Sequence, residues 1–207
     1  MSISHTPCEP ATVSVRKRPR PGERREQILQ TLAEMLEMPK SDKITTAALA
    51  ARLAVSEAAL YRHFASKAQM FEGLIEFIEQ SIFGLVNQIT GREEQGQRQV
   101  QAIMQMLMVF SEKNPGMTRV LIGEALVNED IRLQERINQL IDRIEASLKQ
   151  SLRIASTQSH VEESLDPVLR AALLVNVVLG RWQRFARSGF RKLPSEGLEA
   201  QLRILLA

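Results

Sequence analysis

The feature that most constrains this chain is the spacing of its apolar residues, which recur every three or four positions through most of its 207 residues. That spacing places apolar side chains on one face of an α-helix, whereas a half-buried strand alternates apolar and polar residues. We find no alternating stretch and no internal repeat. The sequence therefore predicts an all-α fold whose amphipathic helices share a core.

Proline, glycine and polar breaks divide the pattern into separate helices. The first begins at Glu23 and should end before Pro39, because proline cannot continue a helix. The other expected helices are Thr46–Leu53, Glu57–Phe64, Ser66 (as cap) to Ile89, Val100–Phe110, Met117–Leu126, about Asn128–Arg153, Pro167 to about Arg187, and Ser195–Leu206. Gly91 and Gly96 bracket one expected break, and Ala155–Asp166 is an expected polar loop.

Two of these helices have especially clear apolar stripes. The stripe after Ser66 comprises Phe71, Leu74, Ile75, Ile78, Ile82, Leu85, Val86 and Ile89. The later stripe, Leu133, Ile137, Leu140 and Ile144, repeats at alternating spacings of four and three, as in a coiled coil. Because it extends over only two heptads, packing against the core is the preferred interpretation.

Positive charge is concentrated near the N-terminus. Residues 1–70 hold eleven Lys and Arg against seven Asp and Glu, a net charge of +4, whereas the whole chain carries +3. This excess suggests an anionic partner at that end, although a solubilising tail is the alternative. Residues 1–22 contain a basic cluster at 16–20 and too little apolar surface to bury, so we expect a disordered basic arm.

The sequence also indicates a compartment. Cys8 is the only cysteine and can form no internal disulfide, and residues 1–10 lack the apolar stretch of a signal peptide. No apolar run reaches the roughly 18 residues that a membrane span needs. We therefore expect a soluble, cytoplasmic protein without membrane contact.

Residues 44–64 form the most specific pattern in the chain. Ala50 and Ala54 are small enough to let two helices cross closely, and Thr45 and Ser56 can cap the two helix N-termini. Apolar wedges between the helices would be Leu49, Leu53, Val55 and Leu60. Caps, small residues, wedges and a basic tip occur in the order of a helix-turn-helix, whose second helix enters the major groove of DNA.

The candidate DNA-binding residues surround this pair of helices. They are Arg24, Arg25, Thr45, Thr46, Ser56, Glu57, Ala58, Tyr61, Arg62, His63 and Lys67. Ser56 lies at a helix N-terminus, where free amides and a partial positive charge suit a phosphate. Short side chains at Ser56 and Ala58 let the helix approach the groove floor, and Tyr61 and His63 reach outward from its far end.

Each of these side chains, taken singly, has an ordinary structural explanation. Tyr61 could pack on Phe64, His63 could be solvated, and Arg62 could pair loosely with Glu57. The prediction of DNA binding therefore rests on the ordered set, not on any one residue.

The segment resembles the helix-turn-helix of the TetR family of bacterial DNA-binding proteins, whose hallmark is this motif followed by Tyr-x-x-Phe and a capped fourth helix. Residues 61–67, Tyr-Arg-His-Phe-Ala-Ser-Lys, match that hallmark. Ala54 departs from it, because the family usually has Gly in the turn and a positive φ costs alanine roughly 1 kcal/mol. The resemblance implies a three-helix DNA-binding domain at 23–69, with its motif at about 45–64, and a helical dimerisation and partner-binding domain at 70–207.

Within that family, the resemblance is to the nucleoid occlusion factors. The residues that carry it are 44–46, 55–64, 74–79, 114–116 and 136–140. It implies a homodimer that binds chromosomal palindromes at the nucleoid and, when bound, engages the division protein FtsZ to block septum formation, with no small-molecule ligand required. It also implies a partner surface on the fourth and fifth helices, where Phe77, Met106, Lys113 and Asn114 fall.

The positions of Phe77 and of three methionines on their helices bear on the implied partner surface. Phe77 lies about 100° from Ile78, the centre of the apolar stripe, so it should sit at the edge of the buried face. A half-exposed aromatic suits an interface, but packing under a neighbouring helix is equally consistent. Met104, Met106 and Met108 fit either a core or an adaptable binding surface.

Other function classes have less support. His5, His63 and His160 share no metal-ligand spacing, and no phosphate-binding Gly-rich loop occurs, so we expect no enzyme, cofactor or metal. The main alternative is a ligand-responsive repressor of the TetR type, with a pocket among apolar C-terminal helices near Asn176 and Trp182. Asn176 could instead cross a dimer interface. A helical scaffold that binds only protein would leave the basic N-terminal third unexplained.

Overall fold

The computed structural model describes residues 22–38, 44–158 and 166–206. Most of the expected basic arm, Cys8, Pro39 and His160 lie outside these ranges. The helices are α1 (Glu23–Leu36), α2 (Thr46–Arg52), α3 (Glu57–Tyr61), α4 (Lys67–Arg92), α5 (Gly96–Lys113), α6 (Pro115–Leu121), α7 (Ile131–Gln158), α8 (Pro167–Arg187) and α9 (Leu198–Leu205), with a short 3₁₀ helix at Glu124–Leu126. The described residues contain no strand, which confirms the all-α prediction.

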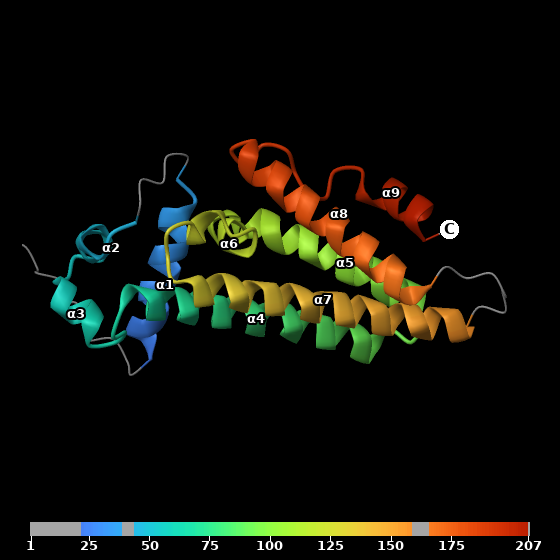
Figure 1. Cartoon of the computed structure of the whole chain (residues 1–207), viewed down its shortest axis with the longest axis horizontal. Coiled ribbons are helices and arrows are strands. Elements are labelled where there is room, and N and C mark those ends of the chain that lie inside the picture. The colour runs from blue at the N-terminus through green and yellow to red at the C-terminus, as the bar shows by residue number, and fades with distance from the viewer. Residues whose placement is uncertain (1–21, 39–43, 159–165, 207) are drawn as a thin grey trace, which may run out of the picture.

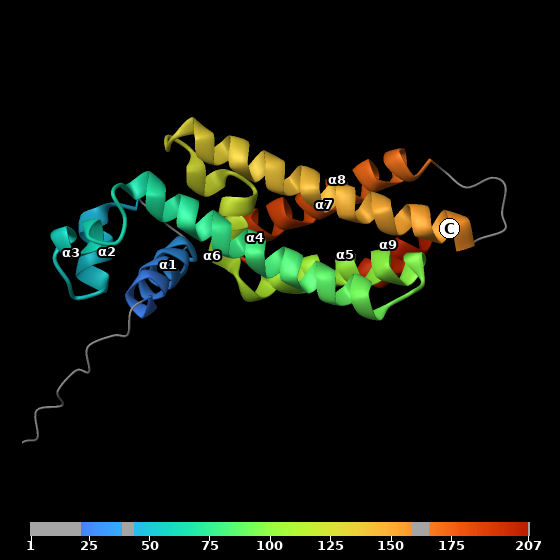
Figure 2. The same cartoon turned by 90° about the horizontal axis from the view of Figure 1, so that it is seen from below.

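The helices form an elongated molecule with a small head at one end of a larger body. Figures 1 and 2 show α1, α2 and α3 at that end, with α4 running from the head along the body. In Figure 1, α8 and α9 lie on the side of the body opposite α4, with α5 and α7 between them. This arrangement leaves α3 at the tip of the molecule.

The body is built around four long amphipathic helices. Buried side chains of α4, α5, α7 and α8 meet in a core that includes Ile78, Leu107, Leu140 and Trp182, each no more than 1% exposed. The Trp182 indole N–H donates to the Leu107 carbonyl at 3.3 Å, so its polar atom is satisfied. Leu133, Ile137, Leu140 and Ile144 are also buried there, in agreement with the preferred interpretation of their stripe.

Several predicted helix boundaries are wrong, because tertiary contacts decide them. The break expected between Gly91 and Gly96 is confirmed, although α4 extends past Ile89 to Arg92. α5 begins at Gly96, where a Cβ would overlap the α7 backbone at Ser151 and Ala155. α7 extends to Gln158, whose side chain donates to the Glu94 carbonyl at 2.8 Å and so joins the end of α7 to the loop between α4 and α5. The expected loop at 155–166 is therefore helical in its first four residues.

Two further expectations need correction. The single helix expected over Met117–Leu126 is interrupted at Gly123, which has a left-handed backbone with φ of 76°, and the chain continues as a 3₁₀ turn. Asn128 also has positive φ, 65°, so α7 starts only at Ile131. Leu85, expected in the buried stripe of α4, is 38% exposed because neighbouring helices do not cover that part of its face.

Candidate DNA interface

The N-termini of α2, α3 and α4 are capped by the side chains that the sequence predicts. The Thr45 hydroxyl accepts from the Ala48 amide at 3.1 Å, and the Ser56 hydroxyl accepts from the Ala59 amide at 3.3 Å. Ser66 caps α4 in the same way, through the Gln69 amide at 3.1 Å. These bonds satisfy amides that a helix N-terminus leaves without a partner.

The turn between α2 and α3 is tight and partly strained. Ala54 has φ of 53°, in the left-handed region expected from its position in the motif. The Val55 amide donates to the Ala50 carbonyl at 3.0 Å, which closes the end of α2. Leu49 and Leu60 are buried between the helices at about 1% exposure, so their apolar side chains hold α3 in place.

The outer face of α3 carries the candidate reading residues. Ser56, Glu57, Ala58, Arg62 and His63 are exposed. Tyr61 is 46% exposed, whereas Phe64, three residues later, is buried at 1%. The structure therefore presents small residues at the start of α3 and longer polar side chains at its end, on the tip of the head.

Two predicted contact residues also hold the head together. The Arg25 guanidinium donates to the His63 carbonyl at 3.0 Å and stacks on the Phe64 ring, 4.2 Å from its centroid. The Thr46 hydroxyl donates to the Glu57 carboxylate at 2.6 Å and so ties α2 to α3. Arg24 is half-buried on α1.

Lys67 connects the head to the body. Its ammonium forms an ion pair with Glu129 at 2.5 Å, and the two side chains are only 22% and 12% exposed. Glu129 lies just before α7, so this contact joins the first residue of α4 to the corner of the body. The position of Lys67 beside Ser66 fits a phosphate contact, but here its charge is already paired.

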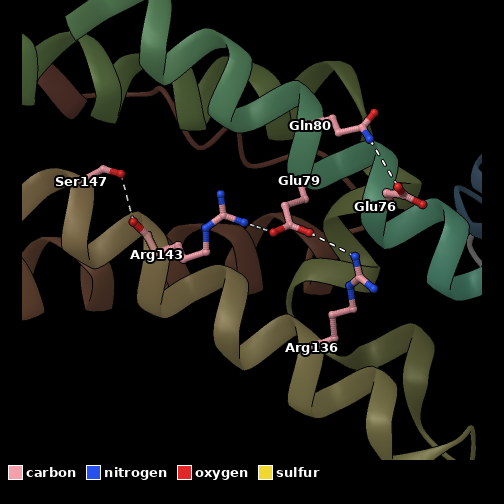
Figure 3. A network of polar contacts seen from close by, with 6 residues as sticks. All are labelled: Glu76, Glu79, Gln80, Arg136, Arg143 and Ser147. Carbon is pink, nitrogen blue, oxygen red and sulfur yellow. Dashed lines mark hydrogen bonds and ion pairs between the residues drawn. The ribbon is translucent and has the colours of Figure 1, made fainter.

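A second ionic contact ties α4 to α7 further along the body. Glu79 points between two arginines of α7, as Figure 3 shows. It pairs with Arg136 at 3.3 Å and also with Arg143, whose guanidinium lies 4.0 Å from the Phe83 ring centroid. Partly exposed pairs contribute modest stability singly, but a shared carboxylate fixes how α4 lies against α7.

Comparison with known proteins agrees with this architecture. A family model described as "Bacterial regulatory proteins, tetR family" matches residues 41–74, and an SlmA-like model, "Tetracyclin repressor-like, C-terminal domain", matches 94–207. Nucleoid occlusion factor SlmA of Vibrio cholerae is 49% identical over 185 residues, which cover 89% of this chain and 94% of that protein. The SlmA of Shewanella pealeana is 50% identical over 178 residues, covering 86% and 90%. This chain belongs to the SlmA family.

Solved structures place this SlmA-family protein in the wider TetR fold. The regulator FadR of Bacillus subtilis in complex with stearoyl-CoA superposes with a TM-score of 0.72 at 12% identity, covering 88% of this chain and 97% of that one. AibR in complex with isovaleryl coenzyme A and operator DNA gives 0.70 at 17% identity, covering 87% and 97%. At such low identity these likenesses show the fold alone.

The residues expected to form a partner surface of the SlmA-family protein lie on α4 and α5. Phe77 is 46% exposed, as its position at the edge of the stripe predicts. Met104 and Met108 are fully buried, whereas Met106 is half-buried and Lys113 is exposed at the end of α5. Asn114 is half-buried, and its side chain donates to the Phe110 carbonyl at 2.8 Å. The Asn114 side chain therefore caps the C-terminus of α5.

Burial shifts the pKa of Glu37 and of Arg181 among the described residues. Burial, and then the charge of Glu34, raise the pKa of Glu37, while a backbone hydrogen bond from Gly116 opposes the shift. Burial, and then Arg184, lower the pKa of Arg181. Within the ranges described, no group of three potential metal ligands occurs and no helix is long and apolar enough to cross a membrane.

The two residues predicted near an effector pocket lie in different environments. Asn176 is exposed on α8, and Trp182 is a buried core residue bonded to α5. Glu129 and Arg119 join the head to the body, and neither residue was expected from the sequence to do so. For Arg119 a signal existed, since it is the only charge between Met117 and Ile122, but its partners are about 80 residues away in sequence.

Proposed function

We propose that this SlmA-family protein is a sequence-specific DNA-binding nucleoid occlusion factor and not an enzyme. It binds chromosomal palindromes as a homodimer and, when bound, antagonises FtsZ assembly, so that no septum forms over the nucleoid. The observation that carries the proposal is the capped, outward-facing α3 at the tip of a chain whose relatives are named nucleoid occlusion factors. The protein would act in the cytoplasm, at the nucleoid.

The DNA-binding role is assigned to residues 23–69. Small residues at the start of α3 would allow it to enter a major groove about 12 Å wide. Tyr61, Arg62 and His63 would then reach bases or adjacent phosphates. The helix N-termini capped by Thr45 and Ser56 would place protein backbone amides near the DNA phosphates. Arg24, Arg25, Thr46 and Lys67 would add phosphate contacts from neighbouring helices.

The dimerisation role is assigned to the outer face of α8 within residues 70–207. Leu169 is 70% exposed and Leu173 is 48% exposed, and Val177 and Gly180 continue the same face of the helix. The exposed Asn176 lies on this face too, where it could cross a dimer interface. An apolar stripe on a surface indicates an interface, and a two-fold axis is the usual symmetry of a homodimer. Two heads related in this way would contact successive major grooves, roughly 34 to 36 Å apart.

The FtsZ-binding role is assigned to the α4–α5 side. Phe77 offers a half-exposed aromatic, the kind of side chain that anchors protein interfaces. Met106 lies half-buried on the same antiparallel pair of helices, and Lys113 adds an exposed positive charge near its head end. This surface is separate from both α3 and the outer face of α8, so DNA, FtsZ and a second protomer could bind together.

Replacement of Tyr61 tests the DNA-binding role. The purified protein would select fragments from sheared genomic DNA, and the affinity of variants for a selected fragment would be measured. We expect Tyr61→Ala to weaken binding by about 10-fold or more, the loss of one good base or phosphate contact, without loss of helicity or dimer. Thr46→Ala should weaken binding as well.

Val127→Ala serves as the control, because Val127 is a 66% exposed apolar residue outside the head. Unchanged affinity of both Tyr61→Ala and Thr46→Ala would remove these residues from the interface. Tight DNA binding together with indifference to FtsZ would favour the alternative, a ligand-responsive repressor.

A further inference from the structure

The C-terminal end of α1 is held by a side chain from the body. α1 has no basic residue in its last turn, although its terminal carbonyls lack helical partners and carry partial negative charge. Arg119 of α6 supplies the missing cation, because its Nη1 donates to the Leu36 carbonyl at 3.0 Å and to the Met38 carbonyl at 2.8 Å. The side chain is only 6% exposed, so these charge-assisted bonds are shielded from water.

The same guanidinium also contacts the end of α8. It lies 5.0 Å from the centroid of the Phe190 ring, and its Nε is 3.4 Å from the Glu124 carboxylate. Phe190 packs edge-on against Phe185 of α8, with ring centroids 5.1 Å apart. Arg119 therefore joins the first helix of the head to the helix assigned to the dimer seam.

Two backbone features support this junction. Phe190 has φ of 63°, a left-handed conformation that is costly for a bulky residue, and its amide donates to the Phe185 carbonyl at 2.9 Å. The chain thus accepts strain that places this ring under Arg119. On the other side, a Cβ at Gly116 would overlap the Ala33 carbonyl oxygen, so α6 lies directly against the α1 backbone.

We propose that Arg119 is the positioning residue that fixes the orientation of the head on the body, and thereby the spacing of the two DNA half-sites that the dimer accepts. The inference rests on the proposed function, since it concerns how a DNA-binding dimer measures its site. A rigid link from α8 to α1 sets the distance between two recognition helices, whereas a loose link would let each head adapt to its own half-site. Fixed positioning also reduces the entropy lost on binding.

The test uses palindromes built from the selected half-site, with the spacer lengthened or shortened one base pair at a time. Arg119→Met keeps the length of the side chain but removes its donors and charge. We expect the ratio of Kd values between the wrong and the right spacing to fall by roughly tenfold, about 1.4 kcal/mol, while binding to an isolated half-site is unchanged. Arg98→Met, an exposed arginine on α5, is the matched control.

Phe190→Leu provides a second variant, because it removes the stacked ring and leaves both carbonyl bonds. It should flatten the spacing preference less than Arg119→Met does. An unchanged spacing preference in a folded Arg119→Met dimer would overturn the proposal. It would also be overturned if Arg119→Met weakened binding to the isolated half-site as much as binding to the palindrome, because that result would indicate damage to the head itself.

A measurement without DNA separates this inference from the proposed function. Nitroxide labels at Arg52→Cys in the head and Ala146→Cys in the body, on a Cys8→Ser background and diluted with an excess of unlabelled protein so that most labelled dimers carry one labelled protomer, report the distance within one protomer. The distance distribution should broaden in Arg119→Met and stay narrow in Arg98→Met. If it stays narrow in both, Arg119 does not fix the head; if the unsubstituted protein binds no palindrome, the proposed function fails independently.

Discussion

Ala54 carries a conformational cost at the point where α2 turns into α3. Its φ of 53° lies in a region that costs an L-residue roughly 1–2 kcal/mol and glycine nothing. Glycine loses more backbone entropy on folding, by about 0.5–1 kcal/mol relative to alanine. The turn is therefore one place where a single substitution should stabilise the folded protein.

Ala54→Gly should raise the free energy of unfolding by up to about 1.5 kcal/mol, the largest difference between these two terms. Chemical denaturation of the two proteins would measure it, with Ala58→Gly as the control, because Ala58 is exposed within α3 and glycine should destabilise a helix there. A lower stability of Ala54→Gly would mean that relief of strain is not the dominant effect.

Residues whose partners are close in sequence were predictable, and those with distant partners were not. The Thr45, Ser56 and Ser66 caps follow from bonds spanning three residues. Arg119 and Lys67 find their partners 62 to 83 residues away, across the junction between head and body. No local pattern specifies such a contact, since it depends on how helices pack.

At the scale of elements, the start of α4 is held in two ways, by its Ser66 cap and by the Lys67–Glu129 ion pair. If Lys67 contacts a phosphate, DNA and Glu129 compete for one ammonium group. The ends of α5, α6 and α7 illustrate a similar dependence on context. Their caps and left-handed residues depend on contacts between helices, which is why their predicted bounds were wrong while the existence of each helix was confirmed.

Glu129→Gln should therefore raise the affinity for DNA, because Lys67 becomes free to neutralise a phosphate. The slope of log Kd against the logarithm of salt concentration should then increase by roughly one per protomer. Titrations at several salt concentrations would show it. Glu135→Gln, which changes an exposed carboxylate on α7, should leave the slope closer to its original value. An unchanged slope in Glu129→Gln would argue against a phosphate contact by Lys67.

At the scale of the whole molecule, three separate surfaces account for the proposed activity: the tip of α3, the α4–α5 side and the outer face of α8. The all-α architecture could be predicted because amphipathic spacing is repeated through most of the chain. The position of the helix-turn-helix could be predicted because its caps, small residues and apolar wedges lie close together in sequence. The arrangement that separates the three surfaces could not, since it arises from packing of α4, α5, α7 and α8 around one core.

Leu173→Asp should dissociate the homodimer at micromolar concentration, because it places a charge in the apolar stripe of α8. Sedimentation equilibrium would detect the change in mass, and helicity should be retained because Leu173 is 48% exposed in the single chain. Val127→Asp, which places the same charge at another exposed apolar position, should remain dimeric. If the Leu173→Asp protein remains dimeric, the dimer interface does not lie on this face of α8.

The most direct test of the central claim is co-sedimentation of the protein with FtsZ polymers, with and without a palindromic DNA fragment. We predict that DNA increases association with FtsZ or disrupts its polymers. Phe77→Ala should bind DNA normally yet lose most of this effect, whereas Tyr61→Ala should lose it through loss of DNA. Polymers that are indifferent to the DNA-bound protein, or an unimpaired Phe77→Ala, would contradict the account.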